Sequence, residues 1–312
     1  MELRHLRYFL AVADTGHITR AAEQLGIQQP PLSQQIKALE QQLGLPLFHR
    51  HPKGVSLTDG GRLFEAEARR IVNDTEAMQA RMALVAKGET GRLDVGITSS
   101  AGAHAFTPRV LRACRINVAS VALTIIERNA AEITEAVTDA RLHCGLLRVP
   151  VATPPGLSFE TLLREPVMVA LPADHPLALR KSRRSRQPVY MQPLSIHDLR
   201  DESLILVRKP GAPGLYQNLL ALFNEQGLHP RIYAEVERMT TNINLVASGM
   251  GVSIVPASMR TLHPEEVVYR PLRESARLDA PITLVYRTAD CVGATARFVA
   301  LCRETARTAA QQ

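Results

Sequence analysis

The sequence has 312 residues, is 46% hydrophobic and carries a net charge of +7, which suits two or three packed domains. No stretch approaches the ~20 consecutive apolar residues of a membrane span. The start also lacks the basic region and apolar core of a signal peptide. We therefore expect a cytoplasmic protein without a membrane partner.

Residues 18–40 have the pattern of a helix-turn-helix. Two short helices that cross steeply need small residues where they touch and a glycine where the chain reverses, and Ala21, Ala22 and Gly26 stand at those places. Pro30 and Pro31 fit the first turn of the second helix, where amide protons have no internal acceptor. Apolar residues recur at helical intervals to hold that helix in place, at Leu25, Ile27, Leu32, Ile36 and Leu39.

The outer face of this segment carries neutral hydrogen-bonding side chains of the kind that read base edges in the major groove of DNA. Lys37 adds a contact to phosphate. The alternative is a helical hairpin packed inside another kind of domain, which would leave the polar face without a role. The DNA contacts that we predict here are Thr19, Arg20, Gln28, Gln29, Pro30, Ser33, Gln34 and Lys37.

The next segment, residues 47–58, has strand-like ends around a Pro/Gly turn that carries Arg50 and Lys53. This pattern predicts a basic wing, which would grip the DNA backbone beside the groove occupied by the recognition helix. Thr58 has the right side chain to cap the following helix, and Asp59 adds favourable charge near its amino end.

A long helix is predicted for residues 59–87, which contain neither proline nor glycine after Gly61. A single helix of ~40 Å with one bare apolar face would be unstable, so we expect it to pair with a second copy of the chain. The alternative partner is the carboxy-terminal domain of the same chain. The apolar residues follow steps of four and three, as in a heptad seam, at Phe64, Ala68, Ile71, Thr75, Met78, Met82 and Val85.

After a predicted hinge at residues 88–91, short apolar runs alternate with amphipathic stretches, which is typical of parallel α/β sheets. Helices are expected at 130–139 and 215–226. The expected strands are 93–98, 121–127, 142–147, 167–171, 204–207, 232–235, 252–255 and 282–286.

The first of these strands runs into a turn of small residues, 95–102, and then into a helix. Free amide protons and a helix dipole gather at such a place, so Ser99 and Ser100 are predicted to contact a carboxylate. The alternative is that both serines only cap the helix. Arg148, Arg208 and Lys209 follow other strands and could neutralise an anion, although each alone also fits a surface charge.

The positive charge is not concentrated where DNA is expected, because residues 1–60 hold six Lys or Arg and five Asp or Glu. Much of the excess lies in Arg180–Arg186, which contains five basic residues in seven positions. A solvated loop explains this stretch better than a second DNA contact does.

Taken together, these segments make the chain resemble a LysR-type transcriptional regulator, nearest in pattern to the regulators of aromatic-compound catabolism. A later stretch, 245–258, resembles the effector-domain signature of that family. The amino-terminal matches are Leu3 to Ala13, Ala21-Ala22-x-x-Leu25, Gln29-Pro30-x-Leu32-Ser33, Ile36-x-x-Leu39-Glu40, Leu43-Gly44-x-x-Leu47-Phe48-x-Arg50 and Leu57-Thr58-x-x-Gly61.

The resemblance implies an α/β fold with an all-α amino-terminal part. Its domains would be a winged helix-turn-helix (1–58), a linker and dimerisation helix (59–87), a hinge (88–91) and an effector-binding domain (92–312). The effector-binding domain would resemble periplasmic solute-binding proteins, with Rossmann-like subdomains at 92–161 with 268–312 and at 162–267, joined by crossovers near 160–166 and 264–270.

The resemblance also implies a function, which we state as a hypothesis. A homodimer or a dimer of dimers binds and bends a promoter in double-stranded DNA. A small organic anion, possibly a carboxylate by class, closes the cleft between the subdomains and lets RNA polymerase start transcription, which makes the protein an activator. Ser100 aligns with the effector-binding serine of the family. Benzoate- and muconate-responsive members carry a threonine where this chain has Ala130, so their ligand does not transfer, although Asn129 could supply the hydrogen bond.

Three other functions would each fit part of the sequence. An enzyme is disfavoured because the sequence lacks the motifs of hydrolases, metalloproteases, phosphate loops and dinucleotide sites, so no catalytic residue, cofactor or metal is expected. An exported solute-binding protein would not need the amino-terminal module. A redox-switched regulator would need reactive thiols. The scattered Cys114, Cys144, Cys291 and Cys302 fit buried small hydrophobes instead.

Overall fold

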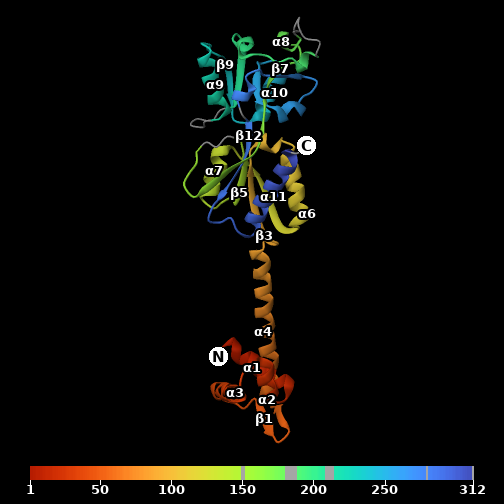
Figure 1. Cartoon of the computed structure of the whole chain (residues 1–312), viewed down its shortest axis with the longest axis vertical. Coiled ribbons are helices and arrows are strands. Elements are labelled where there is room, and N and C mark those ends of the chain that lie inside the picture. Colours follow the sequence, from red (N-terminus) through yellow and green to blue (C-terminus); the bar gives the residue numbers. More distant parts are fainter. Residues whose placement is uncertain (149–151, 180–187, 208–213, 279, 311–312) are drawn as a thin grey trace. The chain divides into compact units, whose positions relative to one another are not determined.

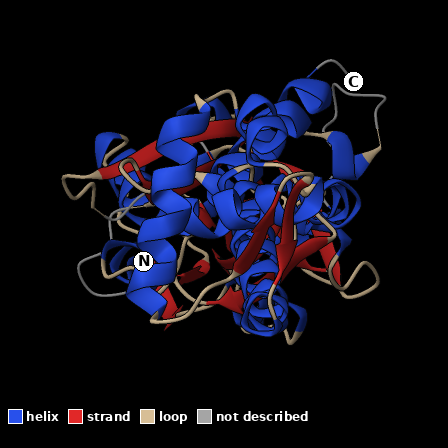
Figure 2. Ribbon diagram, turned by 90° about the horizontal axis from the view of Figure 1, so that it is seen from below, coloured by secondary structure: helices blue, strands red, loops and turns tan. Residues whose placement is uncertain are grey.

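The computed structural model describes residues 1–148, 152–179, 188–207, 214–278 and 280–310, and helices and strands make up most of them (Figure 2). The chain divides into two compact units, Met1–Leu84 and Val85–Gln312. Each unit has its own hydrophobic core, so the two are described separately.

The first unit begins with three helices, α1 (Leu3–Thr15), α2 (Ile18–Leu25) and α3 (Gln29–Leu43). Helices α2 and α3 form the predicted helix-turn-helix. Ala21 and Ala22 are buried between the helices, and Gly26 ends α2 with a φ of +68°, a backbone conformation that glycine adopts without strain. Leu32, Ile36 and Leu39 are buried in the core of this unit, as their helical spacing predicted.

The predicted wing is a two-stranded antiparallel hairpin of β1 (Phe48–His51) and β2 (Gly54–Leu57). Its first strand is tied to α3 by Glu40, whose carboxylate accepts the amide hydrogens of Leu47 and Phe48 at 2.8 and 3.1 Å. These two bonds satisfy backbone donors that no strand partner reaches, and they fix the start of the wing relative to the helix.

Helix α4 (Asp59–Ala86) matches the predicted long helix. Its start is capped as expected, because the Thr58 hydroxyl accepts the amide hydrogen of Gly61 at 2.8 Å. The predicted heptad seam is only partly free to face another chain. Phe64 packs against Phe9 at a centroid distance of 4.9 Å, and Ala68 is fully buried in the core of the first unit.

Apart from the half-buried Thr75, the rest of that seam is open to solvent in the single chain. Ile71, Met78, Met82 and Val85 are all exposed, and Met82 retains 56% of its accessible surface. The prediction that the whole seam serves pairing is therefore wrong for Phe64 and Ala68, which complete the core of the first unit instead.

The second unit contains a five-stranded sheet of order β4-β3-β5-β12-β6, which we name subdomain I. Figure 1 shows α6 and α11 side by side over one face of this sheet and α7 over the other, in agreement with the two apolar clusters that flank it. The bounds are β3 (Thr90–Ile97), β4 (Ser120–Glu127), β5 (Cys144–Leu147), β6 (Leu157–Glu165), β12 (Ala280–Arg287), α5 (Ser99–Gly102), α6 (Phe106–Asn117), α7 (Ala130–Thr138) and α11 (Gly293–Ala310).

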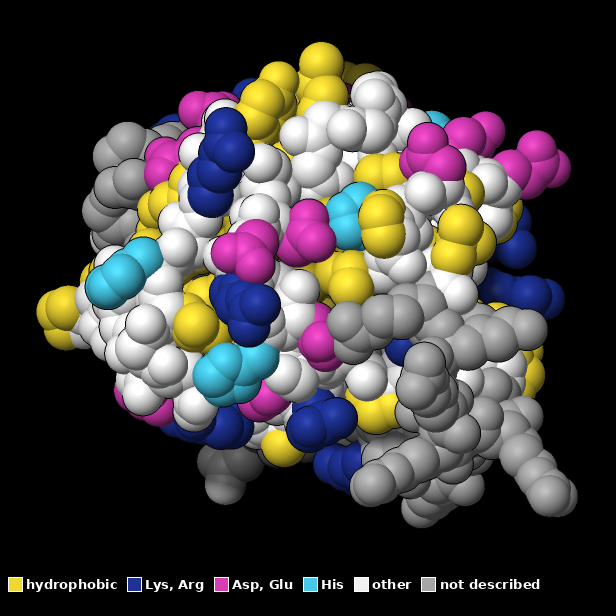
Figure 3. All heavy atoms as spheres, turned by 90° about the horizontal axis from the view of Figure 1, so that it is seen from above, with side chains coloured by type: hydrophobic (Ala, Val, Ile, Leu, Met, Phe, Trp, Pro, Cys, Tyr) yellow, Lys and Arg dark blue, Asp and Glu magenta, His cyan; other side chains and the backbone are white. Residues whose placement is uncertain are grey.

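A second group of strands forms subdomain II, with a three-stranded sheet of order β10-β7-β11 and a parallel pair, β8-β9. The three-stranded sheet and the β8-β9 pair are joined by a β-bridge between Leu204 and Val252. On the face of subdomain II drawn in Figure 3, basic and acidic side chains are interspersed over the described surface. The bounds are β7 (Val167–Pro172), β8 (Ser203–Val207), β9 (Arg231–Val236), β10 (Ser253–Pro256), β11 (Val267–Pro271), α8 (Pro176–Leu179), α9 (Leu215–Glu225), α10 (Met239–Ala247), and the 3-10 turns Val189–Met191, Ile196–Leu199, Ala257–Thr261 and Ser275–Arg277.

The chain passes between the subdomains twice. Strand β6 belongs to subdomain I and β7 to subdomain II, so the first crossover lies at the end of the predicted range 160–166. Residues 162–165, which were predicted to belong to subdomain II, are part of β6 and so belong to subdomain I. The second lies later than expected. Residues 267–271 form β11, which pairs with β7, and the chain enters the five-stranded sheet only at Ala280. The predicted crossover at 264–270, and the assignment of 268–271 to the first subdomain, are therefore corrected.

Candidate functional site

The polar face of α3 is accessible. Leu32, Ile36 and Leu39 are buried on one side of the helix, and Gln29, Ser33 and Lys37, spaced four residues apart, lie along a stripe next to that side. Ser33 is half-buried. The other predicted contacts of this segment are exposed, namely Thr19, Arg20, Gln28, Gln29, Pro30, Gln34 and Lys37.

The local structure leaves these side chains free to face a ligand. Gln28 occupies the N-cap position of α3 without using its side chain as a cap, and Pro30 lies in the first turn. On the wing, Arg50 and Lys53 are exposed on the hairpin. The first unit therefore presents a helix with amide and hydroxyl groups beside a basic hairpin, although the roles of individual residues in DNA contact remain predictions.

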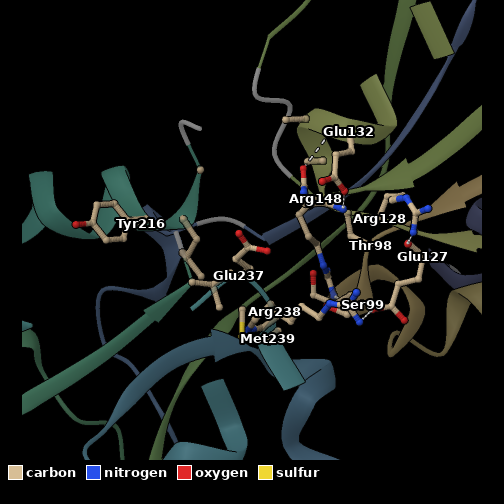
Figure 4. A pocket seen from close by; sticks show the side chains of 18 of the residues that line it. Thr98, Ser99, Glu127, Arg128, Glu132, Arg148, Tyr216, Glu237, Arg238 and Met239 are labelled. Carbon is tan, nitrogen blue, oxygen red and sulfur yellow. Dashed lines mark hydrogen bonds and ion pairs between the residues drawn. The ribbon is translucent and has the colours of Figure 1, made fainter. Parts of the chain in front are cut away.

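The second unit contains a cavity of about 360 Å³ between its two subdomains (Figure 4). That volume is within the range of small-molecule sites. Subdomain I contributes the ends of β3, β4 and β5 and the starts of α5 and α7, and subdomain II contributes the starts of α9 and α10. The cavity is lined by Thr98, Ser99, Ser100, Glu127, Arg128, Asn129, Ala130, Ala131, Glu132, Arg148, Val207, Gly214, Leu215, Tyr216, Glu237, Arg238, Met239, Pro256 and Ala280.

Ser99 and Ser100, which we call the serine turn, line the cavity as predicted. The alternative was that these two serines only cap the helix, but the cap is a different residue. Thr98 is the N-cap of α5, and its hydroxyl accepts the amide hydrogen of Ala101 at 3.3 Å. Ser99 and Ser100 lie inside the short helix, so neither hydroxyl is needed for the cap. Thr98 was missed because the sequence placed it at the end of the strand.

Three longer helices begin at the cavity wall. Asn129 caps α7, since its side-chain oxygen accepts the amide hydrogen of Glu132 at 3.0 Å, and Glu132 in turn accepts the amide hydrogen of Asn129. The first residues of α9 and α10, Leu215 and Met239, line the opposite side. Helix starts carry partial positive charge, so the cavity favours a negative group even where side-chain charges cancel.

Arg148 lies at the cavity, but it is not a free cation. Its guanidinium forms an ion pair with Glu165 at 2.5 Å, and both side chains are nearly buried. It also donates to the backbone oxygens of Ser100 at 2.6 Å and Ala280 at 3.2 Å, and to the hydroxyl of Ser258. Burial lowers the pKa of Arg148, and the nearby Glu165 carboxylate opposes that shift.

The contacts of Arg148 join parts that are far apart in sequence. Glu165 ends β6 at the first crossover, Ala280 begins β12 after the second, and Ser258 belongs to subdomain II. The Ser258 amide and hydroxyl also donate to Glu165, at 2.7 and 2.9 Å. Arg148 therefore holds the serine turn to both crossovers, which is a positioning role, and its predicted contact with an anion stays a prediction.

Two charged pairs at the cavity were missed by the sequence analysis. In the first pair, Glu127 is the last residue of β4 and Arg128 follows it. In the second pair, Glu237 and Arg238 directly follow β9. Arg238 bridges to Glu127 across the subdomains at 3.2 Å. The sequence contained a signal for these residues, because Arg148 was chosen for its position directly after a strand and Arg128, Glu237 and Arg238 share that position.

Arg208, Lys209 and the basic stretch 180–186 lie outside the described residues. The thiols of Cys114, Cys144 and Cys302 are buried in the core of subdomain I, and burial raises the pKa of each. A raised thiol pKa disfavours the reactive thiolate that a redox switch needs. Cys291 is half-buried rather than buried as predicted.

Both units match known families. Residues 3–62 match the family described as "Bacterial regulatory helix-turn-helix protein, lysR family", and residues 86–307 match "LysR substrate binding domain". The chain is 38% identical over 274 residues to the uncharacterized HTH-type transcriptional regulator YnfL of Escherichia coli (strain K12), covering 88% of each chain. It is 33% identical over 287 residues to the HTH-type transcriptional regulator BudR of Raoultella terrigena, covering 92% of this chain and 95% of BudR.

A similar fold is found in the crystal structure of full-length CbnR complexed with its target DNA. The TM-score is 0.68 at 28% identity, over 98% of this chain and 100% of that one. Within the described ranges, no helix has the length and apolar character needed to cross a membrane. The relatives are regulators of transcription, which sets aside the enzyme alternative. The chain belongs to the LysR family of DNA-binding transcriptional regulators.

Proposed function

We propose that this regulator is switched by a small organic anion that binds in the cavity between subdomains I and II. The observation that carries the proposal is the composition of the cavity wall. It combines the serine turn with the starts of α7, α9 and α10, and these elements come from both subdomains. A ligand held by both sides stabilises one arrangement of the subdomains, and its influence is limited by its difference in affinity for the two arrangements.

The DNA-binding unit supplies the output. In this proposal the chain acts in the cytoplasm as a homodimer or a dimer of dimers, paired through the exposed part of α4. It binds an imperfect palindrome and activates transcription by RNA polymerase when the ligand changes the bend of the promoter. Two copies of α3 suit two half-sites, because half-site spacing mirrors the two-fold symmetry of a dimer.

Thermal unfolding of the full-length protein against aliphatic and aromatic carboxylates tests the ligand part of the proposal. A ligand at ~100 times its dissociation constant should stabilise the folded protein by about 2.7 kcal/mol. Ser100→Ala should reduce that effect, because Ser100 lines the cavity and is almost buried. A carboxylate that stabilises both proteins equally would show that it binds elsewhere.

A further inference from the structure

The described wall of the cavity carries equal numbers of positive and negative side chains. Three are arginines, Arg128, Arg148 and Arg238, and three are glutamates, Glu127, Glu132 and Glu237. A wall built only to attract an anion would carry an excess of positive charge. The glutamates therefore need their own explanation.

Most of these charges already have partners within the protein. Arg148 is paired with Glu165 at 2.5 Å, and Arg238 is paired with Glu127 at 3.2 Å. Glu132 accepts the amide hydrogen of Asn129 as part of the α7 cap. Glu237 differs from them, because no hydrogen bond or ion pair joins its carboxylate to another described residue.

Glu237 is placed to face a ligand. It follows β9 and precedes α10 in subdomain II, and Figure 4 shows it projecting into the space between the two sets of lining residues. Ser99, Ser100 and the start of α7, with Arg128 beside it, lie on the subdomain I side. The cavity thus has a side suited to a carboxylate and, opposite it, a carboxylate of its own.

Closure of the cavity around a ligand would remove water from Glu237. A carboxylate that loses water without gaining a cation is costly, and a purely anionic ligand would add repulsion to that cost. A ligand that brings a positive group to Glu237 would turn the same contact into an attraction. Ala130, Leu215, Met239 and Pro256 line the cavity as well, and they suit a hydrocarbon group.

We infer that the effector is a zwitterion of the α-amino acid class. Its carboxylate lies at the serine turn and the start of α7, and its ammonium group lies at Glu237. This inference rests on the proposed function, because it assigns a chemical class to the ligand of the same cavity. It changes the expected effector from a simple organic anion to a molecule that carries both charges.

The test compares matched sets of compounds on the full-length protein. The twenty standard amino acids are first screened by thermal unfolding at pH 7.5. Each amino acid that raises the midpoint is then compared with its deaminated acid and its decarboxylated amine, for example phenylalanine with 3-phenylpropanoate and 2-phenylethylamine. The amino acid should bind at least about tenfold more tightly than either counterpart.

Glu237→Gln keeps the shape of the side chain and removes its charge. We expect this variant to bind the amino acid about tenfold more weakly and to lose its preference over the deaminated acid. Glu265→Gln is the matched control, since Glu265 is exposed in the same subdomain and does not line the cavity. The control should bind like the parent.

Two results would overturn the zwitterion assignment. One is a screen in which no amino acid shifts the midpoint. The other is a deaminated acid that binds the parent and Glu237→Gln as tightly as its amino acid does, which would leave the proposed anion sensor intact. A failure of the proposed function looks different, because the ligand would then bind equally well to the Ser100→Ala variant.

Discussion

Two adjacent glycines at the start of α4 have different neighbours. A Cβ atom on Gly61 would lie 2.1 Å from the backbone oxygen of Leu47, which strand β1 and Glu40 hold in place. A Cβ atom on Gly60 would lie 2.3 Å from Cδ1 of Leu45, the end of a flexible and partly exposed side chain. The first clash requires the backbone to move, whereas the second requires only a rotation.

We therefore expect Gly61→Ala to lower the free energy of unfolding by about 1–3 kcal/mol, the usual cost of overpacking. Gly60→Ala should be neutral or raise it by up to about 1 kcal/mol, because alanine favours the helix. Urea unfolding followed by circular dichroism compares them. Equal stability of the two variants would show that the Leu47 carbonyl group yields easily.

His104 is a residue whose protonation the fold opposes. Its Nδ1 accepts the amide hydrogen of Phe106 at 3.0 Å, at the start of α6. Burial lowers the pKa of His104, and the positive charges of Arg148 and Arg109 lower it further, while Glu165 acts in the opposite direction. A proton on Nδ1 would also break the bond to Phe106.

This shift predicts a pH dependence of stability. Below the ordinary histidine pKa of about 6.5, the unfolded chain takes up a proton that the folded chain resists, so the free energy of unfolding falls as the pH decreases. His104→Asn keeps a side-chain acceptor without a titrating group, and its stability should fall less between pH 7.5 and 5.5. Urea unfolding at both pH values measures this, and parallel losses would exclude His104 as the cause.

At the level of elements, α3 and the wing are expected to contribute differently to DNA binding. Gln29→Ala and Ser33→Ala should weaken binding to the cognate operator by about 1–3 kcal/mol each and leave binding to random DNA nearly unchanged. Arg50→Ala and Lys53→Ala should weaken both, because phosphate contacts carry no sequence information.

Fluorescence anisotropy can measure these affinities on an operator that the protein itself selects from random-sequence DNA. The salt dependence of DNA binding should also distinguish the wing variants from the α3 variants. The loss of one phosphate contact reduces the slope of log K against log salt by about 1, whereas the loss of a base contact does not. Equal losses on both DNAs for Gln29→Ala and Ser33→Ala would refute their assignment to base reading.

The sequence predicted most elements because their apolar periodicity is regular, but it missed β6 and β11. Strand β11 contains Arg270, which is only 2% exposed and donates to the backbone oxygens of Gln192 and Leu177. Strand β6 is half-buried along its length and includes Glu160, which pairs with Arg303. Charged residues that are buried by distant partners break the periodicity from which strands are predicted.

The residues that line the cavity could be predicted where they directly follow strands. The pairing of their charged groups with residues distant in sequence could not be predicted. Ser99, Ser100 and Arg148 follow strand ends, and the structure brings all three to the cavity. The pairing of Arg148 with Glu165 could not be predicted, because Glu165 ends one of the missed strands. Sequence position locates a charged group, but only tertiary contacts decide whether its charge is already neutralised.

For the whole molecule, the main expectation is self-association through α4. Met78 and Met82 are 49% and 56% exposed, and burial of a methionine side chain is worth about 1.5–3 kcal/mol. We expect Met78→Ser with Met82→Ser to raise the dimer dissociation constant at least tenfold. Analytical ultracentrifugation measures this, with Met250→Ser as the control, because Met250 is 44% exposed in the second unit. A parent protein that is monomeric at micromolar concentration would contradict the pairing.

The strand order of subdomain I has a consequence for synthesis of the chain. Strand β12 lies between β5 and β6 in the sheet, yet it is the last strand to leave the ribosome. The strands of subdomain II, β7 to β11, all emerge before it. Because domains tend to fold as units during translation, subdomain II can fold while subdomain I still has a gap in its sheet. A pause in translation before Ala280 would therefore leave the edges of β5 and β6 exposed to chaperones and to aggregation.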